Sequence, residues 1–344
     1  MLTALGAYIF AGGFTLGVEK HFRVQAHFEG NNYGVPTFKR NRPWVPVYVG
    51  YERWPTQRFK HQINFVYCNP PCAPFSSAGA SILRGKDQWR TDPRTNCIHQ
   101  CFSLLEKIEP DVLAIESVTN AFTRGRELFD ELALKANNLG YGVTHLLENA
   151  KWMDTPQHRK RYFFIAHKNK FIHERLNWVP PVTVAERLRD VTDPGYHRPV
   201  RADLQKYYDQ LVEVNGPNGG IRPLWEKDNP PETHVRTRFG VQGRPRMMEH
   251  RLPVNKPMGA FIGDFHIHPT QPRNLGLNEA KALCGYPLDY QFTNERGAFS
   301  ELARGVMPNV GAWLARSVAS TINAREQIET SSQLIDLQEQ PLGI

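Results

Sequence analysis

Apolar runs of strand length alternate with helical patterns through residues 1–170, and this alternation limits the folds that the chain can adopt. The helical stretches repeat apolar residues every three or four positions, and Gly140 supplies a helix stop. Strands are expected at residues 7–10, 23–29, 63–68, 111–117 and 162–168, and helices at 97–108 and 125–140. We therefore predict a doubly wound α/β sheet, whose functional sites lie at the carboxyl ends of its strands.

The composition changes near residue 180, where prolines, glycines and arginines become dense. This density continues to about residue 251 and indicates a second, looser domain. Helical spacing resumes in residues 276–287 and 303–324, and the latter suits a packed closing helix. The predicted parts are a first domain at 1–182, a small second domain at 183–299, a C-terminal segment at 300–325 that returns to the first domain, and a flexible tail at 326–344.

The chain of 344 residues is basic, with a formal net charge of +8. This balance favours a polyanionic partner, although many basic proteins bind no nucleic acid. No apolar run approaches the roughly 20 residues that a membrane helix needs, so we expect no membrane association. The length allows a full hydrophobic core, and a globular cytoplasmic protein is the default expectation.

Five cysteines form an odd, sparse set that is not typical of a disulfide framework. We expect reduced thiols. Cys97 and Cys101 lie one turn apart on a predicted helix, and this is not the spacing of a zinc knuckle, so no metal is expected.

Cys72 follows two prolines just after the apolar run at residues 63–68. A thiol nucleophile must be exposed, fixed in direction and partly ionised, and a strand-end turn stiffened by proline can meet these needs. An inert, buried cysteine in a turn fits the same residues. This short stretch alone therefore leaves both interpretations open.

The motifs around Cys72 resemble those of the cytosine-C5 DNA methyltransferases. N-P-P-C-A-P-F-S is similar to the family's G-P-P-C-Q-x-F-S loop, and other elements follow in the family's order over residues 4–320. They are F-A-G-G-F-T-L-G-V-E, H-F-E-G-N-N, D-P-R-T, I-E-S-V, P-Q-H-R-K-R, R-N-L-G-L-N-E-A-K-A-L-C-G-Y-P and R-G-V-M-P-N-V-G-A-W-L-A-R-S-V-A. The resemblance implies a Rossmann-like S-adenosylmethionine-dependent methyltransferase fold, with a small target-recognition domain inserted before the C-terminal helix.

The same resemblance implies catalytic roles for four residues. Cys72 would attack C6 of a flipped cytosine so that C5 accepts a methyl group, and Glu116 would hold N3 and the exocyclic amine. Taken alone, an acid after an apolar strand is more often a solvated strand-end residue. Arg161 is implied to approach the base and its phosphate, and Arg159 to brace the catalytic loop. Strand alternation points both arginines to one face, with a solvated basic cluster as the alternative.

The cofactor implied by the resemblance is S-adenosylmethionine or a modified form of it. A glycine-rich turn lets main chain approach a ligand, and an acid after the second strand commonly binds ribose hydroxyls. A plain tight turn would explain the glycines equally well. The cofactor-binding residues expected are Tyr8, Phe10, Ala11, Gly12, Gly13, Phe14, Glu29, Gly30, Asn31, Asn69, Pro70, Pro71 and Val306.

Double-stranded DNA is the implied partner, and flipping its target base costs a few kcal/mol that phosphate contacts help offset. Arginines interleaved with glycines can track phosphates or read guanines, and a basic loop without base readout is equally consistent. The residues expected at DNA are Ser76, Arg94, Gln157, Arg236, Arg238, Arg244 and Arg246. We expect a monomer with no obligate protein partner.

The sequence departs from the family pattern mainly at cofactor-facing and loop-supporting positions. Gly6 stands at the position of an acid and Phe10 at that of the first glycine. Asn69, Ala73, Ser117, Asn278 and Val306 also replace usual residues. Three alternatives therefore stay open: a C5 transferase with an altered cofactor or donor, an RNA cytosine methyltransferase, and an inactive DNA-binding homologue. Such divergence suits a phage enzyme, in the cytoplasm of a bacterium or of an infected host cell.

Overall fold

The computed structural model of the chain describes residues 1–76, 87–174, 180–213, 219–237, 240–245 and 249–338. It divides into two compact units. The first unit comprises residues 1–149, 160–177 and 308–344, and the second comprises 150–159 and 178–307. Each unit is described by itself.

A mixed sheet forms the centre of the first unit, and within the described residues it has seven strands in the order β3-β2-β1-β4-β5-β8-β6. The strands from β3 to β5 in this order pair in parallel, and β8 is antiparallel to both of its neighbours, β5 and β6. The strands are β1 (Thr3–Ala7), β2 (Arg23–Glu29), β3 (Val47–Val49), β4 (Phe65–Cys68), β5 (Val112–Val118), β6 (Gly142–Asn149) and β8 (Lys160–His167).

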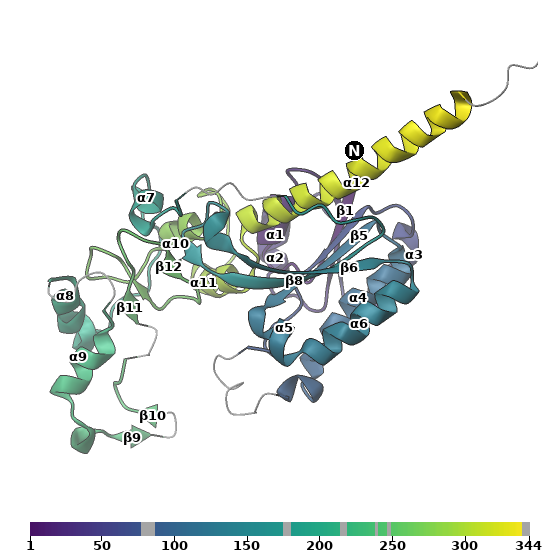
Figure 1. The fold of residues 1–344 in the computed structure, drawn as a ribbon. Coiled ribbons are helices and arrows are strands. Elements are labelled where there is room, and N and C mark those ends of the chain that lie inside the picture. Colours follow the sequence, from purple (N-terminus) through teal and green to yellow (C-terminus); the bar gives the residue numbers. More distant parts are fainter. Residues whose placement is uncertain (77–86, 175–179, 214–218, 238–239, 246–248, 339–344) are drawn as a thin grey trace, which may run out of the picture. The chain divides into compact units, whose positions relative to one another are not determined.

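Helices cover both faces of this sheet (Figure 1). One face is covered by α4 (Asn96–Ile108) and α6 (Arg126–Asn138), and the alternate strand residues Leu5, Val66 and Leu113 belong to the core there. On the other face lie α1 (Gly13–Val18) and α12 (Pro308–Gln338), with Trp313 of α12 against Phe163 of β8. The remaining helices of the unit are α2 (Val35–Asn41), α3 (Thr56–Phe59) and α5 (Thr119–Arg124).

The contact between α1 and α12 depends on glycine. A Cβ atom added at Gly17 would overlap the main chain of Pro308 and Ala312. A Cβ at Gly311 of α12 would lie 2.7 Å from the carbonyl oxygen of Phe14, closer than a real Cβ comes. The last helix therefore packs main chain to main chain against the first one.

The second unit is built from short elements. Its described two-residue strands pair as β7 (Gln157–His158) with β12 (Met258–Gly259), β9 (Arg236–Thr237) with β10 (Gly240–Val241), and β11 (His250–Arg251) with β13 (His266–Ile267). Its helices are α7 (Val184–Leu188), α8 (Gln205–Glu213), α9 (Ile221–Asp228), α10 (Leu277–Leu283) and α11 (Glu295–Arg304). A small core of Leu204, Tyr207, Tyr208, Leu211, Ile221, Trp225 and Ile267 holds part of it together.

The α/β class is confirmed, and several boundaries differ from those expected. The first strand ends at Ala7 instead of Phe10, because residues 8–12 turn away from the sheet with positive φ at Tyr8, Phe10 and Gly12. Within the tail expected to be flexible, the main chain of residues 326–338 continues α12. Glutamate, glutamine and leucine are good helix formers and extend a helix that packing has already nucleated.

The two units also differ in extent from the predicted domains. Residues 150–159 belong to the second unit, which the sequence pattern did not indicate, and the chain returns to the first unit at Pro308. Among the described residues, no helix combines the length and the apolar character needed to cross a membrane.

Candidate active site

Cys72 lies in a turn directly after β4. The buried Asn69 continues the strand, and its main-chain N–H donates to the carbonyl of Ala7 at 3.0 Å. The carbonyl of half-buried Cys72 accepts from the amides of Phe75 and Ser76, both at 3.1 Å. Phe75 is fully buried and packs against Trp89 and Phe129. The loop is thus anchored on both sides of the thiol.

Glu116 lies near the carboxyl end of β5, next to β4, and both of its carboxylate oxygens are bound. The Asn69 amide nitrogen donates to Oε2 at 2.6 Å, and Arg161 Nε lies 2.8 Å from Oε1. The Glu116 side chain is 3% exposed and that of Arg161 17%. Burial of a charge is tolerated when it is paired and hydrogen-bonded, as it is here.

A second cation lies near the thiol. Arg94 binds the buried Asp92 through Nε at 2.9 Å and Nη2 at 2.6 Å. This ion pair raises the pKa of Arg94, and negative charge on Cys72 and Cys97 adds to the effect. Burial raises the pKa of the Cys97 thiol, and the positive charge of Arg94 opposes this rise.

The glycine-rich turn follows β1 and has a strained main chain. Tyr8 and Phe10 both have φ of 59°, in the left-handed region that favours glycine. The ring of Phe10 packs edge-on against Tyr33. The Tyr8 ring contacts Trp54, and its hydroxyl donates to Gln100. Surrounding contacts thus hold two bulky residues in a conformation that costs about 1 kcal/mol or more each.

Glu29 closes the other side of this turn from the end of β2. Its Oε1 accepts the amide of Ile9 at 2.7 Å. Burial raises the pKa of Glu29 to about 8, against the opposing hydrogen bonds from the amides of Ile9 and Phe10. Gly30 follows, and a Cβ there would lie 2.6 Å from the Tyr8 ring. The acid and the glycine turn therefore meet at the carboxyl ends of adjacent strands.

These ordered motifs and this geometry agree with the comparison to known families. The model of the C-5 cytosine-specific DNA methylases matches residues 7–320. The chain belongs to this family. Membership supports cytosine-5 methylation of DNA as its class of activity.

Relatives and solved structures agree with the family assignment. The chain is 25% identical to the type II methyltransferase M.NgoPII of Neisseria gonorrhoeae over 90% of this chain and 93% of the relative. It is 24% identical to M.Bpa9945I of Bacillus paralicheniformis over 76% of this chain and 71% of the relative. A putative DNA modification methyltransferase from an E. coli prophage has a similar fold, with a TM-score of 0.64, 19% identity and coverage of 94% and 100%.

Arg159 and Gln157 precede the last long strand of this family member, and both bind main chain of the second unit. Arg159 is buried and donates to the carbonyls of Phe261, Ala303 and Gly305 at 3.1, 2.8 and 3.0 Å. Gln157 is fully buried; its amide nitrogen donates to Leu283 O at 2.8 Å, and its oxygen accepts from Phe261 N at 3.0 Å.

These contacts bear on two expectations. Gln157, expected at DNA, is fully buried in this structure, and its side-chain amide binds main chain of the second unit. Arg159 and Arg161 were expected to point to one face, yet they hold different partners: Arg161 binds Glu116, and Arg159 holds the segment that precedes Val306. Alternation fails because β7 and β8 are separate strands in different sheets.

The other residues expected at the methylase's ligands vary in how they are placed. Ala11, Gly12, Gly13 and Phe14 are buried in the turn and the start of α1, whereas Gly30 and Asn31 are exposed. Pro70 is buried and Pro71 half-buried beside Cys72, and Val306 is buried in the second unit. Arg244 forms an ion pair with Glu226, and only the main chain of Arg236 is described. Arg238 and Arg246 lie outside the described residues.

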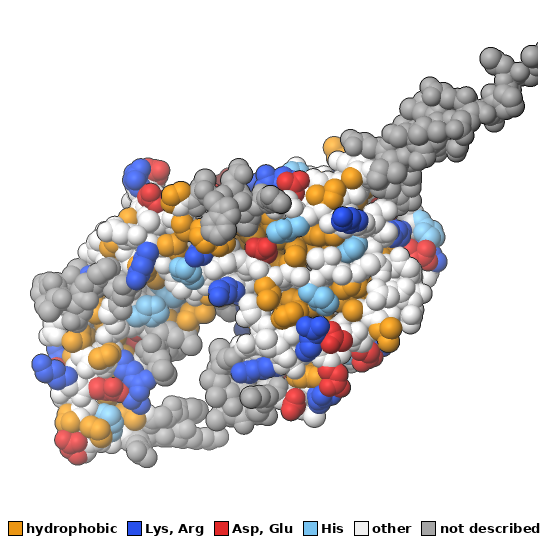
Figure 2. All heavy atoms as spheres, in the orientation of Figure 1, with side chains coloured by type: hydrophobic (Ala, Val, Ile, Leu, Met, Phe, Trp, Pro, Cys, Tyr) orange, Lys and Arg blue, Asp and Glu red, His pale blue; other side chains and the backbone are white. Residues whose placement is uncertain are grey.

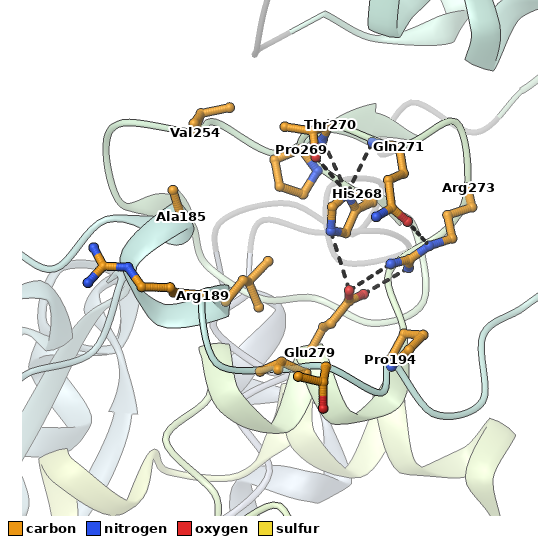
Figure 3. A pocket seen from close by; sticks show the side chains of 13 residues that line it. Ala185, Arg189, Pro194, Val254, His268, Pro269, Thr270, Gln271, Arg273 and Glu279 are labelled. Carbon is orange, nitrogen blue, oxygen red and sulfur yellow. Dashed lines mark hydrogen bonds and ion pairs between the residues drawn. The ribbon is translucent and has the colours of Figure 1, made fainter.

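Lysine and arginine side chains are spread over the visible face of the methylase (Figure 2). One basic residue with a clear structural task is Arg273, in the R-N-L-G-L-N-E element. It binds Glu279 through both terminal nitrogens, at 2.9 and 2.7 Å, beside a cavity of about 390 Å³ (Figure 3). Burial opposes ionisation of Glu279, but bonds from Arg273, His268 and the amide of Gly276 bring its pKa down to about 2.

The His268 ring completes this cluster. Its Nδ1 accepts the amides of Thr270 and Gln271 at 3.2 and 3.1 Å, and its Nε2 lies 3.3 Å from Glu279. The donors and acceptors lining the cavity therefore bind largely to one another, which supports a structural role for this motif.

Sequence reasoning did not single out Asp92 or Tyr67, both of which support the site. Asp92 could have been found, because it begins D-P-R-T and its side chain caps the turn by accepting the Arg94 amide. Tyr67 belongs to none of the sequence motifs, and only the register of β1 and β4 shows that it lies beside Gly6.

Proposed function

We propose that the chain transfers a methyl group from S-adenosylmethionine to C5 of a cytosine flipped out of double-stranded DNA, through a covalent bond between Cys72 and C6. The observation that carries this proposal is the grouping at the ends of β4 and β5. There Asn69, three residues before the half-buried Cys72 thiol, donates to the buried Glu116 carboxylate, and the Arg161 guanidinium binds the other oxygen of that carboxylate.

The chemistry requires C5 of cytosine to become a nucleophile. The Cys72 thiolate bonds to C6, and the C5–C6 π electrons move into the ring toward N3, which takes a proton from the acid form of Glu116 and returns it after C5 has been methylated. C5 then takes the methyl group. Water or hydroxide removes the C5 proton, and the electrons of that bond restore the double bond as the sulfur leaves C6.

Residues at three neighbouring strand ends fit the cofactor. The turn of Tyr8–Gly13 would face its nucleoside and amino-acid parts, and Glu29 would bind ribose hydroxyls. The buried Oδ1 of Asn69 has no hydrogen-bond partner among the described residues, as expected for an atom that faces a ligand. When bound, the cofactor supplies a methyl group activated by a sulfonium.

Mass spectrometry of nucleosides tests the reaction directly. Duplex DNA and matched RNA are incubated with the protein and S-adenosylmethionine, then digested and measured. We expect 5-methyldeoxycytidine from DNA and no 5-methylcytidine from RNA. Methylation of RNA alone would overturn the DNA assignment, and an unmodified product from both would overturn the reaction.

Cys72→Ser should reduce turnover at least about a thousandfold while leaving DNA binding in place, because the hydroxyl is a far weaker nucleophile. Trapping with 5-fluorocytosine DNA checks this: the wild type should form a stable adduct and the variant none. The matched control is Cys97→Ser, which changes another half-buried thiol near Arg94. An adduct in Cys72→Ser would remove this residue from the mechanism.

A second candidate is transfer of a different one-carbon group to the same C5 atom. It is favoured by Phe10, whose side chain stands in a positive-φ turn where the family pattern has glycine. The same nucleoside measurement separates the two, because a different group gives a different product mass.

A further inference from the structure

Gly6 lies between two bulky polar residues at one level of the sheet. In the parallel register, Gly6 of β1 is opposite His27 of β2 and Tyr67 of β4. Residues in register on parallel strands point to the same face. Since glycine contributes no side chain, the imidazole and the phenol can meet across it, with His27 Nε2 3.1 Å from the Tyr67 hydroxyl.

This arrangement leaves no room for the acid of the family pattern. A Cβ added at Gly6 would lie 2.9 Å from Tyr67 Cζ, 3.0 Å from His27 Cδ2 and 2.7 Å from Ile9 Cγ1. Two of these neighbours are fully buried rings, which cannot swing aside. The absent carboxylate and the two rings are therefore alternative fillings of one space.

Thr15 joins the pair from α1. Its Oγ1 lies 2.9 Å from His27 Nε2 and 2.8 Å from the Tyr67 hydroxyl. All three side chains are at most 1% exposed, so their bonds are shielded from water. His27 also stacks on Phe38, and Tyr67 packs edge-on against Phe14. We call Thr15, His27 and Tyr67 the polar triad.

The polar triad connects the two halves of the proposed site. Thr15 stands in the helix that begins immediately after the glycine-rich turn, and Tyr67 stands two residues before Asn69, which holds Glu116. We propose that the polar triad fills the space of the missing acid and holds the donor-binding turn in place against the strand that leads to Cys72. This inference rests on the proposed function for the identity of the donor.

Removing single hydroxyl groups tests the positioning role. Tyr67→Phe and Thr15→Val should each raise the Kd for S-adenosylmethionine about tenfold, as measured by calorimetry, with DNA affinity unchanged. The matched control is Tyr141→Phe, since this buried hydroxyl donates to Pro110 O at 2.8 Å, at the opposite end of β5 from Glu116. Tyr141→Phe should lower the melting temperature as much as Tyr67→Phe and Thr15→Val do, but it should leave the Kd for S-adenosylmethionine unchanged.

The outcomes separate this inference from the proposed function. If the wild type binds S-adenosylmethionine and both hydroxyl variants bind it equally well, the positioning role is overturned and the function stands. If the wild type binds none, the donor assignment fails, and the inference fails with it.

A residue swap tests whether the two fillings are alternatives. Gly6→Asp and Tyr67→Ala should each weaken S-adenosylmethionine binding, the first by overlap and the second by leaving a cavity. The double variant should bind more tightly than either single variant, because the carboxylate then occupies the vacated space. Losses that simply add in the double variant would contradict the proposal.

Discussion

At the scale of single residues, Glu116 shows how much a buried carboxylate depends on its neighbours. Its partners come from the neighbouring strand β8 and from the loop after β4, with Arg161 on one oxygen and Asn69 on the other. The sequence motifs predict that Glu116 and Arg161 share a site. They do not predict the contact with Asn69, because a loop amide has no periodic pattern and its partner lies 47 residues away.

Arg161→Ala should cost about 3 kcal/mol of unfolding free energy, because it leaves a buried carboxylate without its cation. Urea denaturation measures this. Turnover should fall together with stability, since the Glu116 side chain would lose the partner that holds one of its oxygens in place. The control is Arg90→Ala, which breaks the exposed ion pair with Glu127 and should cost under about 1 kcal/mol. If both variants lost the same unfolding free energy, burial of the Arg161–Glu116 ion pair would not be what makes it important for stability.

At the scale of secondary structure, local patterns predict the long elements well. The helices at α4 and α6 and the strands β4, β5 and β8 begin and end within a few residues of the expected positions. Apolar residues recur regularly in these elements, because each helix or strand buries one of its faces or both. The first strand was predicted too far along the chain, because Tyr8 and Phe10 are residue types that favour strands. In the structure they lie in a turn, held by the hydrogen bond from Ile9 to Glu29 and by ring contacts with Trp54 and Tyr33.

Gly17→Ala should destabilise the protein by about 3 kcal/mol, because the added methyl group overlaps the main chain of α12. Thermal unfolding of the full chain checks this. Gly297→Ala is the matched control: it is also a helical glycine, but its Cβ would meet Asn294 no closer than 3.5 Å. That change should be neutral or stabilise by less than about 1 kcal/mol. A neutral Gly17→Ala would mean that the two helices separate at little cost.

At the scale of the whole molecule, the sequence predicts two parts but not how the chain is divided between them. Residues 150–159 join the second unit because Gln157 and Arg159 bind carbonyls more than 100 residues later in the chain. A local sequence pattern cannot indicate hydrogen-bond partners that lie so far along the chain. Strands of only two residues in the second unit are likewise too short for periodicity to indicate them.

Arg159→Ala should loosen the second unit selectively. It leaves three carbonyls, of Phe261, Ala303 and Gly305, without this donor, at about 1–3 kcal/mol for each that stays buried and unpaired. Hydrogen exchange read by mass spectrometry should show faster exchange around residues 258–267 and 300–307. Exchange in β4 and β5 should be unchanged. Arg244→Ala, which removes only an ion pair with Glu226, is the control. Uniform loss of protection would show that Arg159 stabilises the whole chain instead.

The packing of α12 on the first unit has a consequence for synthesis on the ribosome. The sheet face beside α1 is complete in sequence by β8, yet the helix that packs over it begins only at Pro308. During translation, Phe163 lacks its partner Trp313 until about 150 further residues have been made. A nascent chain stalled before Pro308 thus presents an uncovered apolar surface, and such truncated products should be prone to aggregation and dependent on chaperones.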